Sequence, residues 1–162
     1  MLRTLAVYPE LCTGCHQCEL WCSFAKTAAI NPARARIHVL RREPSLDVPL
    51  VCVQCGLCIA CCSHQAIERN ERTGAVVVDE KACVGCDSCI AACPYGMITK
   101  DPTARTVLKC DLCSGSPECA MHCRTGAIRY EDATLVAGQR REVYARVLGV
   151  ELRGGSASNV IL

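Results

Sequence analysis

Four copies of one cysteine pattern constrain this chain more than any other feature of its sequence. Three sets have the spacing C-x2-C-x2-C-x3-C, and the fourth keeps the first and last intervals but has five residues in the middle one. Together they use sixteen of the 17 cysteines and leave Cys61 over. In chain order the sets are Cys12, Cys15, Cys18, Cys22; Cys52, Cys55, Cys58, Cys62; Cys83, Cys86, Cys89, Cys93; and Cys110, Cys113, Cys119, Cys123.

The spacing within each set suits a 4Fe-4S cluster. Three thiolates two residues apart on a tight loop converge on three irons of one cube, and the last cysteine, on the short helix that follows, serves the other cluster of a pair. Gly14 and Gly85 lie inside two of the loops, where the lack of a Cβ lets backbone N–H groups approach the sulfurs. The sequence therefore predicts four 4Fe-4S clusters, with all sixteen cysteines as ligands.

A structural zinc module and a disulfide scaffold are the alternatives. Zinc takes four ligands, usually as two well-separated pairs, which fits runs of three plus one less well. Disulfides are typical of exported proteins, and residues 1–8 contain neither an apolar signal region nor a twin arginine. No stretch of about 18 uninterrupted apolar residues is present. We therefore expect a cytoplasmic protein with reduced thiols and without a membrane span.

Composition and charge agree with clusters in place of a large apolar core. The 162 residues include one Phe, one Trp and four Tyr, so large core side chains are few. The formal net charge of +2 becomes roughly −6 if four clusters bind, because each oxidised core with its four thiolates carries about −2. The basic residues are then needed to offset cluster charge, and nucleic acid is not expected as a partner.

The segments between the cysteines predict a loop-rich α+β fold. Short helices are expected around residues 16–26, 56–62, 88–93 and 118–122, and a hairpin over residues 66–79 with its turn at Gly74. The strand-like run before the first set and the G-A-I-R-Y after the fourth are expected to pair. These features together predict two interleaved ferredoxin-like bicluster halves with short helices and β-hairpins, in which clusters act as the core.

Two segments lie outside the cysteine sets. The insertion at residues 23–51 contains the alternating R-A-R-I-H-V-L of residues 34–40, which predicts an added strand that covers a cluster rather than an open docking edge. Residues 1–130 form the predicted four-cluster domain, and residues 131–162 form a C-terminal extension. Within it, the apolar spacing at residues 143–148 predicts one short amphipathic helix, and the apolar end suggests a docking tail.

The motifs resemble those of the four-cluster ferredoxin-like electron-transfer subunits of molybdenum or tungsten pterin oxidoreductases and some hydrogenases. The matching stretches are V-C-V-Q-C at 51–55, C-V-G-C-D-S-C-I-A-A-C-P-Y-G at 83–96, and K-C-D-L-C-S-G with C-R-T-G-A-I within 109–128. The family tends to have proline after the last cysteine of a motif, which only Pro94 provides here. In length the chain is most similar to the small iron-sulfur subunit of a tungsten aldehyde oxidoreductase of the aldehyde:ferredoxin type.

The resemblance implies crossed ligation, with the first set paired to the fourth and the second to the third. The four implied ligand groups are Cys12, Cys15, Cys18 and Cys123; Cys110, Cys113, Cys119 and Cys22; Cys52, Cys55, Cys58 and Cys93; and Cys83, Cys86, Cys89 and Cys62. Cys61 is then interpreted as a small buried residue. His16, His64 and His122 lie near these cysteines and are expected to have surface or hydrogen-bonding roles.

The function predicted from these features is electron relay without a substrate site of the chain's own. The chain would pass single electrons through four 4Fe-4S clusters between a catalytic subunit, expected to be a tungsten or molybdenum aldehyde oxidoreductase, and a flavin subunit, a ferredoxin or another acceptor. Self-association into longer wires is a further possibility. The same design also fits a subunit of a hydrogenase or carbon monoxide dehydrogenase, and the alternative of another class is the structural zinc module.

Overall fold

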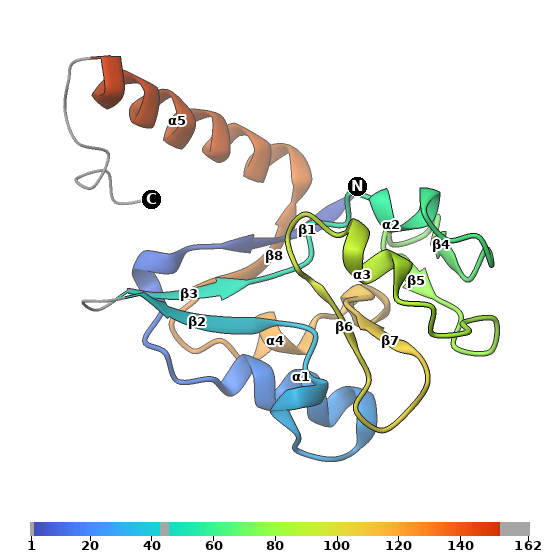
Figure 1. Cartoon of the computed structure of the whole chain (residues 1–162). Coiled ribbons are helices and arrows are strands. Elements are labelled where there is room, and N and C mark those ends of the chain that lie inside the picture. The colour runs from blue at the N-terminus through green and yellow to red at the C-terminus, as the bar shows by residue number, and fades with distance from the viewer. Residues whose placement is uncertain (1, 43–45, 153–162) are drawn as a thin grey trace.

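A computed structural model describes residues 2–42 and 46–152 of the chain. Its strands form four two-stranded antiparallel sheets, and short helices lie between them (Figure 1). This agrees with the predicted loop-rich α+β fold of short helices and small hairpins. The domain boundary at residue 130 and the division into two ferredoxin-like halves stay predictions.

The two ends of the cysteine-rich region pair with each other, as predicted. Strand β1 (Arg3–Val7) runs antiparallel to β8 (Ile128–Asp132), with Leu5 opposite Tyr130. The Tyr8 N–H continues the ladder by donating to the Ala127 carbonyl at 2.8 Å. Because β1 precedes the first cysteine set and β8 follows the fourth, this sheet brings the first and fourth sets together (Figure 1).

Two further hairpins belong to the second and third sets. Strands β4 (Ile67–Arg69) and β5 (Val76–Val78) form the predicted hairpin, with Gly74 at a φ of +70° in the turn. Strands β6 (Ile98–Lys100) and β7 (Val107–Lys109) form a hairpin that sequence reasoning missed. It places the end of β7 directly before the fourth cysteine set.

Each predicted helix is present and lies at the end of a cysteine loop. The helices are α1 (Gln17–Thr27), α2 (Leu57–Ala60), α3 (Ser88–Ala92) and α4 (Glu118–Met121). The first three begin after a residue in the left-handed conformation, namely His16, Gly56 and Asp87. In the fourth set the longer middle interval instead contains the 3-10 turn η3 (Leu112–Gly115), whose residues Leu112, Cys113 and Ser114 have positive φ.

Helix α1 is the one of these four helices that continues past the last cysteine of its set. Beyond Cys22, Ser23 is fully buried and its hydroxyl donates to the Leu20 carbonyl at 2.9 Å. The same hydroxyl accepts from the Asn31 N–H at 3.2 Å. Ser23 thereby joins the helix to the insertion that follows it.

The insertion packs against the core group that contains Leu5 and Ile128, but its strand begins later than predicted. Turn η2 (Pro32–Arg34) precedes strand β2 (His38–Arg42), which pairs with β3 (Leu46–Leu50). Pro32 starts the 3-10 turn and the Asn31 side chain accepts from the Ala33 N–H, so the predicted strand at residues 34–37 does not form. The predicted alternation still holds for burial, because Ala35, Ile37 and Val39 all point into the core.

Two small groups of buried residues form the core, and both mix aliphatic side chains with cysteines. One contains Leu5, Ile37, Leu112 and Ile128 with Cys18, Cys22 and Cys119; the other contains Ile67, Val76, Ile98 and Val107 with Cys58 and Cys89. No aromatic side chain belongs to the fully buried set among the described residues. The hydrocarbon core is therefore small, as the composition indicated.

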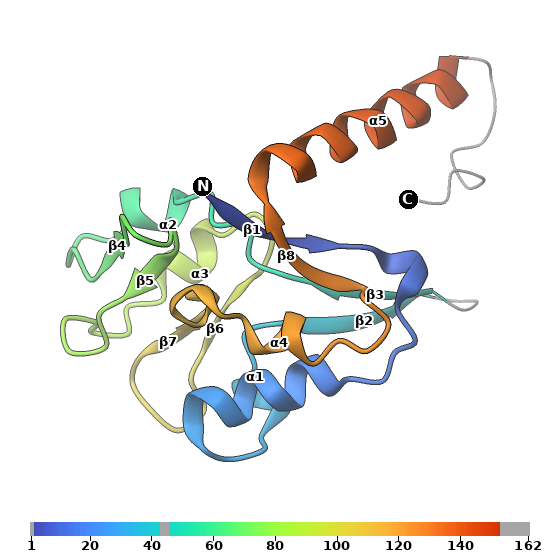
Figure 2. The same cartoon turned by 180° about the vertical axis from the view of Figure 1, so that it is seen from behind.

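The final helix, α5 (Ala133–Leu152), projects away from this body (Figures 1 and 2). Its first turn is capped by Asp132, whose side chain accepts from the Thr134 N–H at 2.8 Å. The helix is much longer than the one predicted at residues 143–148. Val136 is buried, whereas Leu135 and Tyr144 are 67% and 65% exposed.

The predicted apolar docking end lies outside the described residues. Within the described residues, no helix is both long and apolar enough to cross a membrane.

A buried carboxylate, Asp101, joins the β6–β7 loop to the insertion and suggests a stability test. Asp101, in the β6–β7 loop, accepts from the Arg34 guanidinium of η2 at 2.7 Å and from the Thr103 N–H at 2.8 Å. Burial acts to raise the pKa of Asp101, but the hydrogen bonds from Thr103 and Arg34 hold it below its usual value. A depressed pKa stabilises the folded state above the unfolded pKa, and that contribution is lost as the pH falls through the folded pKa.

We predict that Asp101→Asn lowers stability at pH 7 by about 1–2 kcal/mol, because it leaves Arg34 without its charged partner. Thermal unfolding, followed under anaerobic conditions by loss of visible absorption, measures the effect. Glu80→Gln, at an exposed position, is the control and should change stability little. Between pH 6 and pH 8 Asp101 stays ionised, so the difference between wild type and Asp101→Asn should not change in this range. Equal stability of Asp101→Asn and wild type throughout this range would contradict this account.

Candidate iron-sulfur sites

Three cavities lie among the cysteine loops, and each is lined by four cysteines from two different sets. The cysteines that line the three cavities are Cys52, Cys55, Cys58 and Cys93; Cys62, Cys83, Cys86 and Cys89; and Cys22, Cys110, Cys113 and Cys119. In each cavity three members come from one set and the last cysteine comes from the paired set. These groups coincide with three of the implied ligand groups, although ligation itself stays a prediction.

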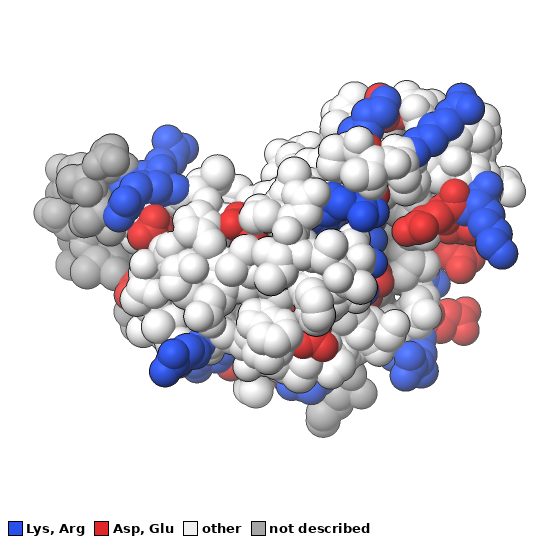
Figure 3. All heavy atoms as spheres, turned by 90° about the horizontal axis from the view of Figure 1, so that it is seen from below, with Lys and Arg blue, Asp and Glu red and all other residues white. Residues whose placement is uncertain are grey.

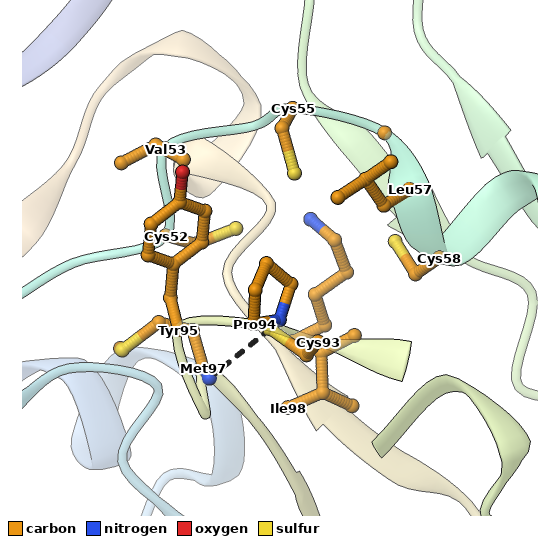
Figure 4. A pocket seen from close by; sticks show the side chains of 12 residues that line it. Cys52, Val53, Cys55, Leu57, Cys58, Cys93, Pro94, Tyr95, Met97 and Ile98 are labelled. Carbon is orange, nitrogen blue, oxygen red and sulfur yellow. Dashed lines mark hydrogen bonds between the residues drawn. The ribbon is translucent and has the colours of Figure 1, made fainter. Parts of the chain in front are cut away.

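Figure 4 shows the first of these cavities, which we call the Cys55 cavity. Cys52 and Cys55 approach it from the loop before α2, Cys58 from α2 itself, and Cys93 from the other side, directly after α3. Val53, Leu57, Pro94 and Tyr95 form an apolar rim around the sulfurs. The site therefore offers thiols in a largely hydrocarbon surrounding.

The fourth implied group comprises Cys12, Cys15, Cys18 and Cys123, and its members are also close to one another. Burial raises the pKa of Cys12, and the neighbouring Cys15 and Cys123 raise it further. Burial likewise raises the pKa of Cys18 to about 12, with smaller contributions from Cys15 and Cys12. The structure thus brings Cys123, the last cysteine of the fourth set, next to the first set.

Buried thiols dominate the electrostatics of these sites. Burial raises the pKa of Cys110 to about 12 and that of Cys89 to about 11, and it also raises the pKa of Cys119. Thiolates are the form that binds metal, and several thiolates in one dry cavity repel one another. A cationic iron-sulfur core supplies the missing positive charge, so the donor set and its surroundings fit such a cluster.

Backbone N–H groups point at several of the sulfurs. The Arg36 N–H donates to Cys22 Sγ at 3.3 Å, and the Met97 N–H donates to Cys93 Sγ at 3.4 Å (Figure 4). Burial acts to raise the pKa of Cys123, but hydrogen bonds from the backbone of residues 126–128 and from the Thr125 hydroxyl hold it below its usual value. Hydrogen bonds of this kind stabilise negative charge on a ligand sulfur.

Two glycines allow close approach at these loops. A Cβ at Gly14 would lie 2.5 Å from an Asp47 carboxylate oxygen, and one at Gly85 would lie 2.0 Å from the Arg105 carbonyl oxygen. Both glycines also have positive φ, near +65°. The predicted need for glycine at these loops is therefore confirmed, with crowding by other segments as an added reason.

In the described part of the chain, no three Cys, His, Asp or Glu side chains are grouped closely enough to hold a single metal ion.

Cys61 differs from the other cysteines in its contacts. Its thiol donates to the Cys58 carbonyl at 3.3 Å, and its side chain packs against the second core group. It lies near enough to Cys89 to contribute to the raised pKa of that thiol. However, Cys62 and not Cys61 is among the residues that line the cavity shared with Cys89.

The nearby histidines have different surroundings. His16 contacts Glu19 at 2.7 Å on the exposed start of α1. His122, at the end of α4, stacks on Trp21 of α1, with ring centroids 3.6 Å apart and planes within 5°. His64 lines the cavity of Cys62 and Cys83, in addition to the surface position that was expected.

The sequence predicted that basic residues, including Arg36 and Lys109, offset cluster charge, but it did not predict their contacts. Lys109 is buried, lines the Cys55 cavity and is hydrogen-bonded to Gln54. Lys26 and Arg36 both contact Asp111, at 2.7 and 3.7 Å, beside the cavity of Cys110. The position of Lys109 directly before Cys110 does not reveal its burial. Seen from below, the molecule has a broad face with few charged side chains in its middle (Figure 3).

Comparison with known proteins identifies related sequences. The family described as "4Fe-4S dicluster domain" matches residues 45–133. The aliphatic sulfonate oxidoreductase, polyferredoxin-like subunit, of Pyrococcus furiosus is 36% identical over 143 residues, which cover 86% of this chain and 81% of that protein. Subunit beta of the NADH-dependent phenylglyoxylate dehydrogenase of Aromatoleum evansii is 34% identical over 132 residues. That match covers 78% of this chain but only 30% of the longer protein.

Solved structures with a similar chain include two of the active site complex BamBC of benzoyl coenzyme A reductase. In the complex with zinc, the matched chain is 25% identical with a TM-score of 0.48, and the match covers 90% of this chain and 91% of that one. In the complex with benzoyl-CoA, the identity is 24% and the TM-score is 0.47, with the same coverage.

The different contacts of Cys61 and Cys62 lead to a direct prediction. Cys61→Ser should leave the iron content unchanged, because the hydroxyl can still donate to the Cys58 carbonyl. Cys62→Ser should lose iron from the cavity that Cys62 lines. Anaerobic iron and sulfide analysis of both variants is the measurement, with wild type prepared in parallel. Loss of iron in Cys61→Ser together with full iron in Cys62→Ser would show that Cys61 is the ligand.

Proposed function

The chain belongs to the 4Fe-4S dicluster domain family, and from this premise we propose that it is a four-cluster electron-transfer subunit of an oxidoreductase complex. Iron-sulfur binding and membership of a family of electron-transfer subunits follow from the family and from the polyferredoxin-like relative. The number of clusters, their ligands and the catalytic partner are the proposal. The observation that supports it most is the lining of each cavity by four cysteines from two sets.

We propose the crossed ligand sets as the sequence implied them. Cys12, Cys15 and Cys18 act with Cys123, and Cys110, Cys113 and Cys119 act with Cys22. Cys52, Cys55 and Cys58 act with Cys93, and Cys83, Cys86 and Cys89 act with Cys62. This arrangement makes each half of the protein depend on two cysteine sets.

When bound, 4Fe-4S clusters accept and release single electrons over a wide range of potentials. The residues of this chain hold them, keep water away and adjust the charge around them. Val53, Leu57 and Tyr95 form the apolar rim of the Cys55 cavity. The Arg36 and Met97 N–H groups donate to ligand sulfurs in two different cavities. Hydrogen bonds to the sulfurs and nearby positive charges favour the more negative, reduced state of a site.

For the catalytic partner we propose a tungsten or molybdenum pterin oxidoreductase, with an aldehyde oxidoreductase as the first candidate. The resemblance of the cysteine motifs supports the pterin class, and the Pyrococcus furiosus relative is named as a subunit of an aliphatic sulfonate oxidoreductase. A flavin subunit or a ferredoxin would accept the electrons. We also propose a cytoplasmic location, where thiols remain reduced until clusters are assembled. Purifying the native complex anaerobically and measuring its tungsten and molybdenum tests the partner.

Four complete ligand sets predict about sixteen iron and sixteen acid-labile sulfide per chain. Anaerobic metal analysis of the isolated chain measures both. About twelve of each would show that one set is empty, and stoichiometric zinc in place of iron would support the zinc module. Removal of iron by a chelator should also unfold the chain, because the cysteines contribute much of the small core and metal binding is linked to folding.

Crossed ligation predicts which cluster is lost when one cysteine is replaced. Cys123→Ser should perturb the cluster held by Cys12, Cys15 and Cys18 and spare the one held by its sequence neighbours Cys110, Cys113 and Cys119. Electron paramagnetic resonance of the reduced protein separates the clusters, and Cys15→Ser should change the same signal. Cys61→Ser serves as the matched control. A Cys123→Ser spectrum that instead matches Cys113→Ser would refute the crossed assignment.

A further inference from the structure

Lys109 is a buried side chain between two of the cysteine cavities. It is the last residue of β7 and is 5% exposed. Its side chain lines the Cys55 cavity. The next residue, Cys110, lines the neighbouring cavity together with Cys22, Cys113 and Cys119, which we call the Cys110 cavity. Lys109 therefore lies where the two halves of the protein meet.

The hydrogen bonds of Lys109 show that its amine is a charged ammonium. Nζ contacts three acceptors, which are Gln54 Oε1 at 3.0 Å, the Val76 carbonyl at 2.6 Å and the Cys110 carbonyl at 3.0 Å. Three acceptors require three N–H donors, and only the ammonium form of lysine has three. The charge is therefore held in one place by neutral oxygens.

No carboxylate neutralises this ammonium within the described residues, where the ion pairs involve other basic side chains. A buried charge without a charged partner is costly. Lys109 lines the cavity of Cys52, Cys55, Cys58 and Cys93, and its Nζ donates to the Cys110 carbonyl at 3.0 Å, so the charge lies beside both cavities.

Gln54 fixes the position of the ammonium relative to the second and fourth cysteine sets. Its Oε1 accepts from Lys109 Nζ and from the Val76 N–H at 2.9 Å, and its Nε2 donates to the Cys110 carbonyl at 3.0 Å. Gln54 lies between Cys52 and Cys55 and has a positive φ of 55°. The second set, β5 and the start of the fourth set are thereby joined through one amide and one ammonium.

We propose that Lys109 sets the potentials of the clusters in the Cys55 and Cys110 cavities and so controls electron passage between the two halves. This inference rests on the proposed function. One electron leaves one site and enters the other, without a bond or a proton being exchanged. Each reduction adds one negative charge beside the fixed ammonium, which favours the reduced state. A buried charge is screened by salt far less than an exposed one.

The test is a redox titration of the full chain followed by electron paramagnetic resonance under anaerobic conditions. Lys109→Met and Lys109→Gln remove the charge, and Lys109→Gln keeps a polar donor. Both should shift the reduction equilibrium of the two adjoining sites about tenfold toward the oxidised form, which corresponds to a potential lower by about 59 mV for one electron. The cluster of Cys12, Cys15 and Cys18 should titrate as in wild type.

Two controls separate charge from packing. Lys109→Arg keeps the positive charge and should retain the wild-type potentials at both sites. Lys81→Met makes the same chemical change at an exposed position and should leave every potential unchanged. A Cys55→Ser variant assigns the signal of the Cys55 cavity, so the site that shifts can be identified.

Three outcomes would overturn the inference. One is an unchanged set of potentials in fully iron-loaded Lys109→Met and Lys109→Gln. Another is an equal shift in Lys109→Arg, which would make the effect one of packing. The last is loss of iron from both neutral variants while Lys109→Arg stays loaded, because the lysine would then serve assembly and not potential. Failure of the proposed function is distinct, because wild type itself would then lack reducible iron.

Discussion

The sharing of each cysteine cavity between two sets is the constraint on which the rest of this structure depends. In three cavities, three cysteines come from one set and the fourth is the last cysteine of the paired set. A loop of this size supplies three thiols on one side, so the fourth corner has to come from elsewhere. The chain therefore cannot complete one site before the paired motif is in place, and folding and cluster binding are expected to be linked.

Two of the small antiparallel sheets bring the paired cysteine sets together. Pairing of β1 with β8 brings together the first and fourth sets, which are separated by nearly the whole cysteine-rich region. The β4–β5 hairpin performs the same role for the second and third sets over a short distance. These sheets have only two strands each, and such small units are weak alone. The core groups with cysteines and aliphatic side chains, and ties such as Arg34–Asp101, hold them together.

The charged side chains around the thiols differ in how far they are exposed to solvent. Exposed basic side chains are screened by solvent, whereas Lys109 is enclosed between two cavities with three neutral acceptors. Asp111 is held by Lys26 and Arg36 beside the Cys110 cavity. Burial acts to raise the pKa of Asp111, but the hydrogen bond and charge of Lys26 hold it below its usual value. In the proposal above, the position of this buried ammonium matters more for the two neighbouring sites than the formal net charge of the chain.

The sequence by itself determined the chemistry and much of the local structure. Cysteine spacing indicated iron-sulfur binding, and glycine and apolar patterns indicated the four helices, the β4–β5 hairpin and the pairing of β1 with β8. It misplaced the start of β2, because Asn31 and Pro32 form a turn whose geometry competes with strand alternation. Only the tertiary structure decided the burial of Lys109 and its link to Gln54, since residues 55 positions apart meet through side chains whose contacts no local pattern encodes. For Cys61 and Cys62 the spacing had already assigned only Cys62 to a set, and the structure adds that Cys62 lines a cavity whereas the Cys61 thiol donates to the Cys58 carbonyl, a contact that no spacing encodes.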